Sequence, residues 1–265
     1  MHRNVCGWML CGLVALCGTA CSPSARPDLR RADRQHNEAD FITLFDGTST
    51  EGWNIYIEPG PKSRMRIDGQ ERAVDNVTAF PDAFYLEDGA LACKGYGYHW
   101  FRYEARPFAD FVLRLEFKTA RETNSGVCLR TRKEGAPPFT GFEIQISDDT
   151  NKDPNRRPGD GLLDPAGTAP NKHSTGAIYD IVTPMYNASR PIGEWNEMEI
   201  TCDGHLVKVI LNGFTVIDTD FSKLTAKHGK FDFPYAQMPR TGYIALQDHW
   251  TPIWYRNIRI KTLDE

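Results

Sequence analysis

The chain has 265 residues, of which 40% are hydrophobic and 25% charged, an ordinary composition for a globular protein. Its formal net charge of −4 excludes the strongly basic surface typical of nucleic-acid-binding proteins, so we expect no nucleic-acid partner. The length fits one large all-β domain or two smaller domains, and the elements along the chain have to decide between them.

Residues 1–21 predict a secretory signal peptide. A short basic start leads into an apolar run from Val5 to Cys17, which is too short for a stable membrane span. The run ends in "GTAC", which resembles a bacterial lipobox although Gly18 stands where Leu is commonest. We expect Cys21 to be lipidated and to anchor the protein in the bacterial cell envelope, facing the periplasm or the cell surface. Plain secretion is the alternative.

Residues 22–39 are polar and charged, have no apolar period, and predict a flexible tether that makes no contacts with the rest of the chain. From Phe41 onwards short strand signals alternate with turns, and residues 40–265 are expected to form a single domain. Alternation of apolar and polar residues predicts strands at 110–118, 125–131, 140–147, 176–182 and 242–250, and Asn212-Gly213 predicts a hairpin within 205–218. The only helix expected is a short one around Phe221–His228. Many short strands favour a β-sandwich or a barrel.

Two long polar segments, 57–82 and 148–175, interrupt the strands and are rich in Pro, Gly and Asp. Such loops are functional lids or solvated insertions, and they are where specificity would lie. Five acidic residues of the second segment are candidate Ca²⁺ ligands, although their spacing matches no calcium motif: Asp148, Asp149, Asp153, Asp160 and Asp164.

Three cysteines remain in the mature chain if Cys21 carries lipid, and each lies within an apolar, strand-like run: Cys93, Cys128 and Cys202. One disulfide is conceivable, but we expect buried thiols. No Cys and His spacing indicates a metal site.

The polar side of several predicted strands carries residue types suited to a sugar ligand. Strand parity places six side chains outward: Arg130, Glu143, Gln145, Tyr179, Gln247 and His249. None is a lysine, the residue that a merely solvated face favours. Amides, Tyr, His, Arg and one Glu provide planar hydrogen-bonding groups and a ring for stacking. We therefore predict that these residues line one binding cleft.

Several motifs resemble one family in order and in wording: "FITLFDGTSTEGW", "TNSGVCLR", "GFEIQISDD", "TGAIYDI", "GEWNEMEI" and "TGYIALQDH…YRNIRIK". They are similar to the bacterial DUF1080 family, now called the 3-keto-disaccharide hydrolase domain, over about residues 41–261. The resemblance implies a concanavalin A-like jelly-roll β-sandwich with long loops and a site on its concave sheet. It also implies an enzyme outside the cytoplasm that acts on glycosides oxidised to a ketone at C3, made by a separate sugar 3-oxidoreductase.

The residues fit that chemistry better than ordinary glycoside hydrolysis. Laminarinase-like relatives on this fold use Glu-x-Asp-x-x-Glu, whereas the equivalent stretch here has Glu143, Gln145 and Asp148. A C3 ketone acidifies the C2 hydrogen, so elimination needs a base, a stabiliser of the enolate and a proton for the leaving group. We expect Glu143 and His249 to exchange protons and Arg130 to stabilise the enolate.

The other candidate residues would bind substrate: Gln145, Tyr179, Gln247, and, as reserves for the base, Asp148, His173 and Asp248. No cofactor is firmly expected, but a divalent metal held by Glu143 and His249 could replace Arg130 as the stabiliser. A non-catalytic carbohydrate-binding module is the alternative function, and a structural surface domain is a third.

Overall fold

The computed structural model describes residues 36–57, 64–67, 70–73, 83–95, 97–149, 170–229, 231 and 233–263. In these ranges the chain is almost entirely β, as expected. The few helices of this part are one short α-helix and three 3-10 turns: α1 (Pro137–Thr140), η1 (Glu38–Asp40), η4 (Phe221–Lys223) and η5 (Tyr235–Gln237). None of them has the length and apolarity needed to cross a membrane.

The strands of the described ranges form two large antiparallel sheets and one small one. The eight-stranded sheet runs in the order β13 (Phe214–Asp220), β12 (Leu206–Leu211), β11 (Trp195–Asp203), β8 (Phe111–Thr119), β15 (Ile253–Thr262), β6 (Ala90–Cys93) and β5 (Phe84–Glu87), with β1 (Ile42–Phe45) also paired to β15. The five-stranded sheet runs in the order β10 (Phe142–Ser147), β9 (Asn124–Thr131), β14 (Gly242–His249), β7 (Tyr98–Phe108) and β2 (Trp53–Ile57). The small sheet pairs β3 (Arg64–Ile67) with β4 (Gln70–Ala73).

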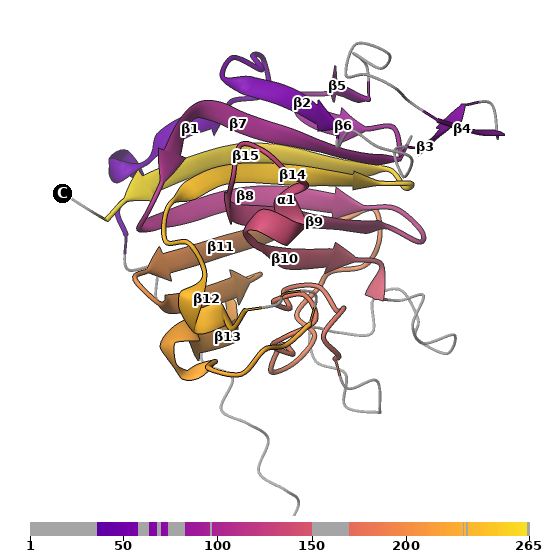
Figure 1. The fold of residues 1–265 in the computed structure, drawn as a ribbon. Coiled ribbons are helices and arrows are strands. Elements are labelled where there is room, and N and C mark those ends of the chain that lie inside the picture. Colours follow the sequence, from indigo (N-terminus) through magenta and orange to yellow (C-terminus); the bar gives the residue numbers. More distant parts are fainter. Residues whose placement is uncertain are drawn as a thin grey trace, which may run out of the picture.

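The two large sheets stack face to face as a jelly-roll β-sandwich, the architecture that the resemblance implied (Figure 1). Alternate residues of each strand point between the sheets, where burial of their apolar surface stabilises the fold. These inward residues include Phe111, Leu113, Leu115 and Phe117 of β8, and Phe142, Ile144 and Ile146 of β10. The strands on both sides of the core therefore follow the predicted parity, which fixes the side chains on the outer faces.

The hairpin predicted from Asn212-Gly213 is confirmed. Strands β12 and β13 pair directly across this turn, and both turn residues have positive φ, at 51° and 85°. Asn and Gly adopt this conformation at low cost, so the turn specifies the register of the hairpin. Asn212 also donates a side-chain hydrogen bond to the Ala188 carbonyl, which ties the turn to the preceding loop.

Three local expectations were wrong. The segment at 176–182 is not a regular strand; Ile178 forms isolated bridges to Ile144 and Val182 beside β10. The helix expected around residues 221–228 is reduced to η4, capped by the Asp220 side chain. Helix α1 was not expected, because a single turn that begins with two prolines carries no helical period. Most of the two predicted long loops lies outside the described residues.

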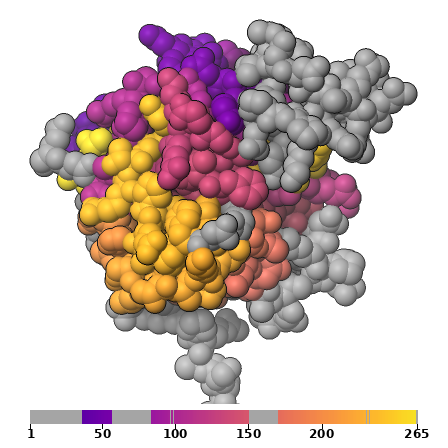
Figure 2. Space-filling model, viewed as in Figure 1, coloured from indigo at the N-terminus to yellow at the C-terminus, as the bar shows by residue number. Residues whose placement is uncertain are grey.

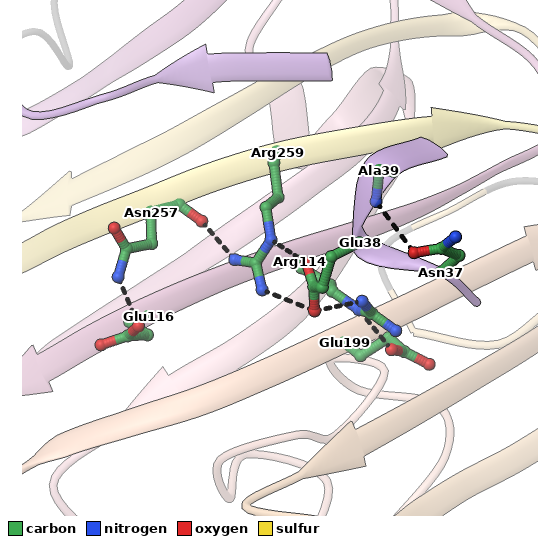
Figure 3. Close-up of polar contacts among 8 residues, drawn as sticks. All are labelled: Asn37, Glu38, Ala39, Arg114, Glu116, Glu199, Asn257 and Arg259. Carbon is green, nitrogen blue, oxygen red and sulfur yellow. Dashed lines mark hydrogen bonds and ion pairs between the residues drawn. The ribbon is translucent and has the colours of Figure 1, made fainter. Parts of the chain in front are cut away.

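The tether prediction is wrong for the residues just before the sandwich (Figure 3). Glu38 forms ion pairs with Arg114 of β8 at 2.6 Å and with Arg259 of β15 at 3.0 Å. Arg114 also pairs with Glu199 of β11 at 2.7 Å. The parity of β8 places these groups on the outer face of the eight-stranded sheet, so η1 is docked there and the contacting domain begins before residue 40.

Cys93, Cys128 and Cys202 are buried thiols, as expected. Burial raises the pKa of Cys202 to about 12 and raises the pKa of Cys93 as well, so both stay protonated and unreactive at neutral pH.

Candidate functional site

The candidate site lies on the outer face of the five-stranded sheet, where β10, β9 and β14 are neighbours. Glu143 stands opposite Cys128 and Gln145 opposite Gly126 across the β10–β9 ladder. Strand β9 also pairs with β14, where Leu246 stands opposite Val127. The outward residues Gln247 and His249 of β14 therefore lie on the same face. We call the outward group on these three strands the site face: Asn124, Glu143, Gln145, Gln247 and His249.

Small side chains make room on this face for the Glu143 carboxylate. A methyl group at Gly126 would lie 2.7 Å from Glu143 Cγ and 2.9 Å from Cδ, closer than real contacts allow. The Glu143 side chain therefore lies across Gly126 rather than pointing straight away from the sheet. Glu143 is only 4% exposed, which is unusual for a carboxylate and indicates a specific role.

The connection from β9 to β10 covers the neighbouring part of the same face. Ala136, at the start of α1, packs on Trp100, Cys128 and Ala245 in one apolar cluster, with Tyr56 beside it. In Figure 1 the α1 turn lies in front of β9, and Figure 2 shows the same side with its side chains. This packed apolar cluster therefore bounds the site face on one side.

Three polar side chains of the site face form one chain of hydrogen bonds. Gln145 Nε2 donates to Asn124 Oδ1 at 2.9 Å and to the Ile146 carbonyl at 3.3 Å. Asn124 Nδ2 lies 2.9 Å from His249 Nδ1. These bonds show that residues far apart in sequence meet here, and they place Glu143 and His249 on the same side of the sandwich, as predicted.

His249 is partly buried, and burial lowers its pKa below the ordinary value of 6.5. Its own main-chain carbonyl and the Asp248 charge act in the opposite direction but do not outweigh desolvation. The imidazole is therefore neutral at neutral pH, which is the form that accepts or donates a hydrogen bond without carrying charge.

Tyr179 lies beside β10, since its main-chain N–H donates to the Glu143 carbonyl at 3.0 Å. Burial, followed by the charges of Asp180 and Glu143, raises the pKa of Tyr179, so its phenol stays a donor. The ring of His173 lies 4.8 Å from the Tyr179 ring, and His173 Nε2 lies 2.6 Å from Asp180 Oδ1. Tyr179 and His173 thus form one edge of the site, next to Glu143.

Arg130 does not join the other predicted site residues, and the expectation that it faces outward is wrong. Its guanidinium is buried and donates to Asp110 Oδ1 at 2.8 Å and to the carbonyls of Ala109 and Gly204. The β9–β14 register slips between Tyr243 and Ala245, and Arg130 itself has a φ of 53°. A β-bulge of this kind inserts one residue and reverses the parity after it.

The two reserve carboxylates also point elsewhere. Asp148 Oδ2 accepts the main-chain N–H of Glu122 at 2.9 Å, at the turn that precedes β9. Asp248 is fully buried and lies 3.4 Å from His99 Nδ1, on the opposite side of β14 from Gln247 and His249. Both carboxylates have structural partners away from the Glu143 side chain.

Sequence reasoning missed Asn124 and Gly126, although both precede the outward Cys128 at even spacing in "TNSGVCLR". Extending the parity backwards along β9 would have found them. Trp100 and Tyr56, which flank the site face, were not assigned either, because their strands showed no clear alternation.

The described side chains include no group of three His, Cys, Asp or Glu residues arranged to hold a metal ion. A metal at Glu143 and His249 would need further ligands from substrate or water, and this suggestion stays a prediction. Of the five proposed Ca²⁺ ligands, Asp153, Asp160 and Asp164 lie outside the described residues. Asp149 accepts hydrogen bonds from the hydroxyls of Ser147 and Ser189.

The jelly-roll fold thus carries a carboxylate, two amides and an imidazole on the outer face of one sheet. The chain belongs to the family described as the 3-keto-alpha-glucoside-1,2-lyase-like domain, which it matches over residues 40–261.

Named relatives agree with this family. A 3-keto-disaccharide hydrolase from Bacteroides thetaiotaomicron is 24% identical over 84% of this chain and 79% of that protein. Among solved structures, a "putative glycosyl hydrolase" from Parabacteroides distasonis is 29% identical, covers 84% of this chain and 99% of its own, and superposes with a TM-score of 0.61. Another of the same description, at 22% identity, covers 86% and 98% with a TM-score of 0.60 and supports the fold alone.

Proposed function

We propose that the protein cleaves glycosides whose sugar carries a ketone at C3, by elimination at the site face followed by addition of water. The family and the B. thetaiotaomicron relative support the substrate class. The observation that carries the proposal is the Glu143 carboxylate, which is buried over Gly126 on the same face as His249. A carboxylate in such a place is suited to proton abstraction.

The reaction has a simple proton and electron balance. Glu143 removes the C2 proton, and the C2–H electron pair forms an enolate whose charge rests on the C3 oxygen. When the ketone reforms, the pair moves between C1 and C2 and the C1–O bond breaks with its electrons on the leaving oxygen. That oxygen takes up one proton, which restores the balance. Water adding to the unsaturated keto sugar gives net hydrolysis.

Retaining or inverting hydrolysis by two carboxylates has less support. That mechanism needs a second carboxylate across the scissile bond from the first. The position that would supply it is Asp148, just after β10, and its carboxylate accepts the Glu122 N–H instead. A single base acting beside a ketone fits this arrangement better.

Gln145 supports the assignment of a polyhydroxylated ligand. Its Oε1 atom is buried and has no hydrogen-bond partner among the described residues, while Nε2 is fully used. A buried acceptor left without a donor costs about 1–3 kcal/mol, so a site that keeps one is suited to a donor from the ligand. We assign Gln145 Oε1 to a sugar hydroxyl, with Tyr179 and Gln247 orienting the ring.

We also propose that the protein is anchored by lipid at Cys21, which lies outside the described residues, and works in the bacterial cell envelope. The signal-like sequence of residues 1–21 supports this location. Glu38 is docked on the outer face of the eight-stranded sheet, opposite the site face. An oxidoreductase that forms the C3 ketone has to act first.

The test is turnover of a 3-keto-glucoside by the purified protein, followed by the ultraviolet absorbance of the enone and by release of the alcohol. Wild type should turn over, while the unoxidised glucoside should not react. Parallel assays with and without chelator decide whether a metal takes part. Binding of the keto-glucoside without turnover would identify a carbohydrate-binding module instead.

A further inference from the structure

The hydrogen-bond chain from β10 to His249 determines which ring nitrogen of His249 carries a proton. It begins at a main-chain carbonyl, that of Ile146, which can only accept. The Gln145 side-chain atom 3.3 Å from it is therefore the NH2 group. The reverse orientation would place Gln145 Oε1 against the Ile146 oxygen, with two acceptors facing each other.

The same NH2 group fixes the Asn124 side chain. Because an NH2 group only donates, the Asn124 atom 2.9 Å away is the oxygen, and the remaining atom of the amide is its own NH2. That NH2 lies 2.9 Å from His249 Nδ1 and needs an acceptor there. Nδ1 of the neutral ring then carries no proton, and Nε2 carries it.

The Thr251 hydroxyl holds the main chains of the two residues that form this last bond, Asn124 and His249. Thr251 Oγ1 accepts the Asn124 N–H at 2.9 Å and lies 3.3 Å from the His249 carbonyl. Asn124 and His249 are therefore kept side by side by contacts that do not involve their side chains.

We propose that Asn124 is a positioning residue that holds His249 as the neutral tautomer with its proton on Nε2. His249 then acts as a hydrogen-bond donor, toward the enolate oxygen or the leaving oxygen, and Glu143 is the base. This division of roles rests on the proposed function, whereas the tautomer itself does not. It replaces Arg130, whose guanidinium is bound to Asp110, as the stabiliser of the enolate.

The first test needs no variant. Long-range proton–nitrogen correlation spectra of the ¹⁵N-labelled wild type, recorded above pH 7, separate a protonated from an unprotonated ring nitrogen, and loss of the signals in His249→Gln assigns them. We expect Nδ1 unprotonated and Nε2 protonated. A proton on Nδ1, donated to His249's own carbonyl, or a mixture of the two tautomers would overturn the proposal.

The second test reverses the direction of the hydrogen bond between residue 124 and His249. In Asn124→Asp the carboxylate only accepts, so Nδ1 should become the donor, the tautomer should reverse, and the pKa of His249 should rise by about one unit or more. Asn54→Asp adds the same charge to β2 of the same sheet and should change neither. An unchanged tautomer in Asn124→Asp would show that Asn124 does not control it.

Kinetics complete the test and separate the two proposals. With a 3-keto-glucoside, Asn124→Asp should lower kcat by about 10²-fold with little change in KM. The hydrogen bond from His249 Nε2, which this change removes, is made only in the transition state. If wild type does not turn over the substrate but its tautomer is Nε2–H, the proposed function fails and the positioning of His249 stands. If wild type turns over the substrate with Nδ1 protonated, the proposed function stands and the positioning of His249 by Asn124 fails.

Discussion

At the scale of single residues, Glu143 is the side chain to which we assign the role of base. Glu143→Gln keeps the shape and removes the base, so we expect turnover of a 3-keto-glucoside to fall by about 10²-fold or more while binding survives. Calorimetry of keto-sugar binding and the enone assay measure the two effects separately. Glu51→Gln, an exposed carboxylate before β2, is the control. Wild-type turnover in Glu143→Gln would reduce Glu143 to a hydroxyl acceptor.

The lowered pKa of His249 sets a pH dependence with a definite sign. Because its pKa in the folded protein lies below the unfolded value of 6.5, the unfolded chain binds the proton more readily. The contribution of neutral His249 to stability is therefore complete above about pH 6.5 and is lost as the pH falls through the lowered pKa.

The free energy of unfolding, measured against pH in urea, should show this loss in wild type and not in His249→Gln. If the two proteins show the same pH dependence of stability, His249 is not desolvated as described.

Arg130 gives the opposite kind of prediction, because its partners are structural. Its side chain is 2% exposed, and Arg130→Met removes the ion pair with Asp110 and the hydrogen bonds to the Ala109 and Gly204 carbonyls, while Asp110 keeps Arg240 at 3.1 Å. We expect a loss of about 1–3 kcal/mol in the free energy of unfolding, because two carbonyls lose their donor, with kcat of the folded protein nearly unchanged. Arg132→Met, an exposed neighbour, should be neutral. A large fall in kcat without loss of stability would restore Arg130 to the site.

Much of the site could be predicted from strand parity alone, and the failures have a common cause. Glu143, Gln145, Gln247 and His249 follow the two-residue period of unbroken strands. Arg130 does not, because the bulge adds a residue. The signal for that bulge is indirect: Gly242 lies against the Arg130 main chain so closely that any side chain would clash with it. A single sequence does not show which glycines serve such contacts.

At the scale of elements, β9 makes room for the Glu143 carboxylate because Gly126 has no side chain. Gly126 has an ordinary backbone conformation, so only space is at issue in Gly126→Ala. The new methyl group should displace the Glu143 carboxylate, lower kcat by about tenfold or more, and cost about 1–3 kcal/mol of stability.

The matched control for that change is Glu143→Asp in the Gly126→Ala background, which removes one methylene from the crowded side chain. It should recover stability relative to Gly126→Ala alone, as measured by thermal unfolding. If Gly126→Ala keeps full activity and stability, the carboxylate does not need its place above β9.

The same scale separates what the sequence could and could not predict of the fold. Strands with clear alternation and a two-residue turn, such as β12 and β13, were predicted together with the turn that joins them. The segment at 176–182 also alternates, yet it makes only isolated bridges, because its hydrogen bonds to β10 are interrupted by turns of its own, such as Ile181 N–H to the Ile178 carbonyl. The alternation of apolar and polar residues does not predict whether the main-chain groups of a segment will bond to a neighbouring strand or within the segment itself.

At the scale of the whole molecule, the N-terminal turn joins the sheet that lies opposite the site. Glu38 binds Arg114 and Arg259, and Asp40 binds Lys261 at 2.7 Å (Figure 3 shows the Glu38 contacts). A chain that begins at His36 keeps all of these ion pairs, whereas a chain that begins at Phe41 loses them. Because Glu38 is half exposed, each pair contributes at most about 0.2–1 kcal/mol.

We therefore expect the chain beginning at Phe41 to be less stable by roughly 1 kcal/mol, with unchanged kcat, and the difference to shrink at high salt. Glu38→Gln with Asp40→Asn in the longer chain is the matched control and should reproduce the loss, since Arg114 keeps Glu199 in both. Urea unfolding at low and high salt measures it. A loss several times larger in the shorter chain than in the double variant would mean that the main chain of η1, rather than its charges, holds the N-terminus to the sandwich.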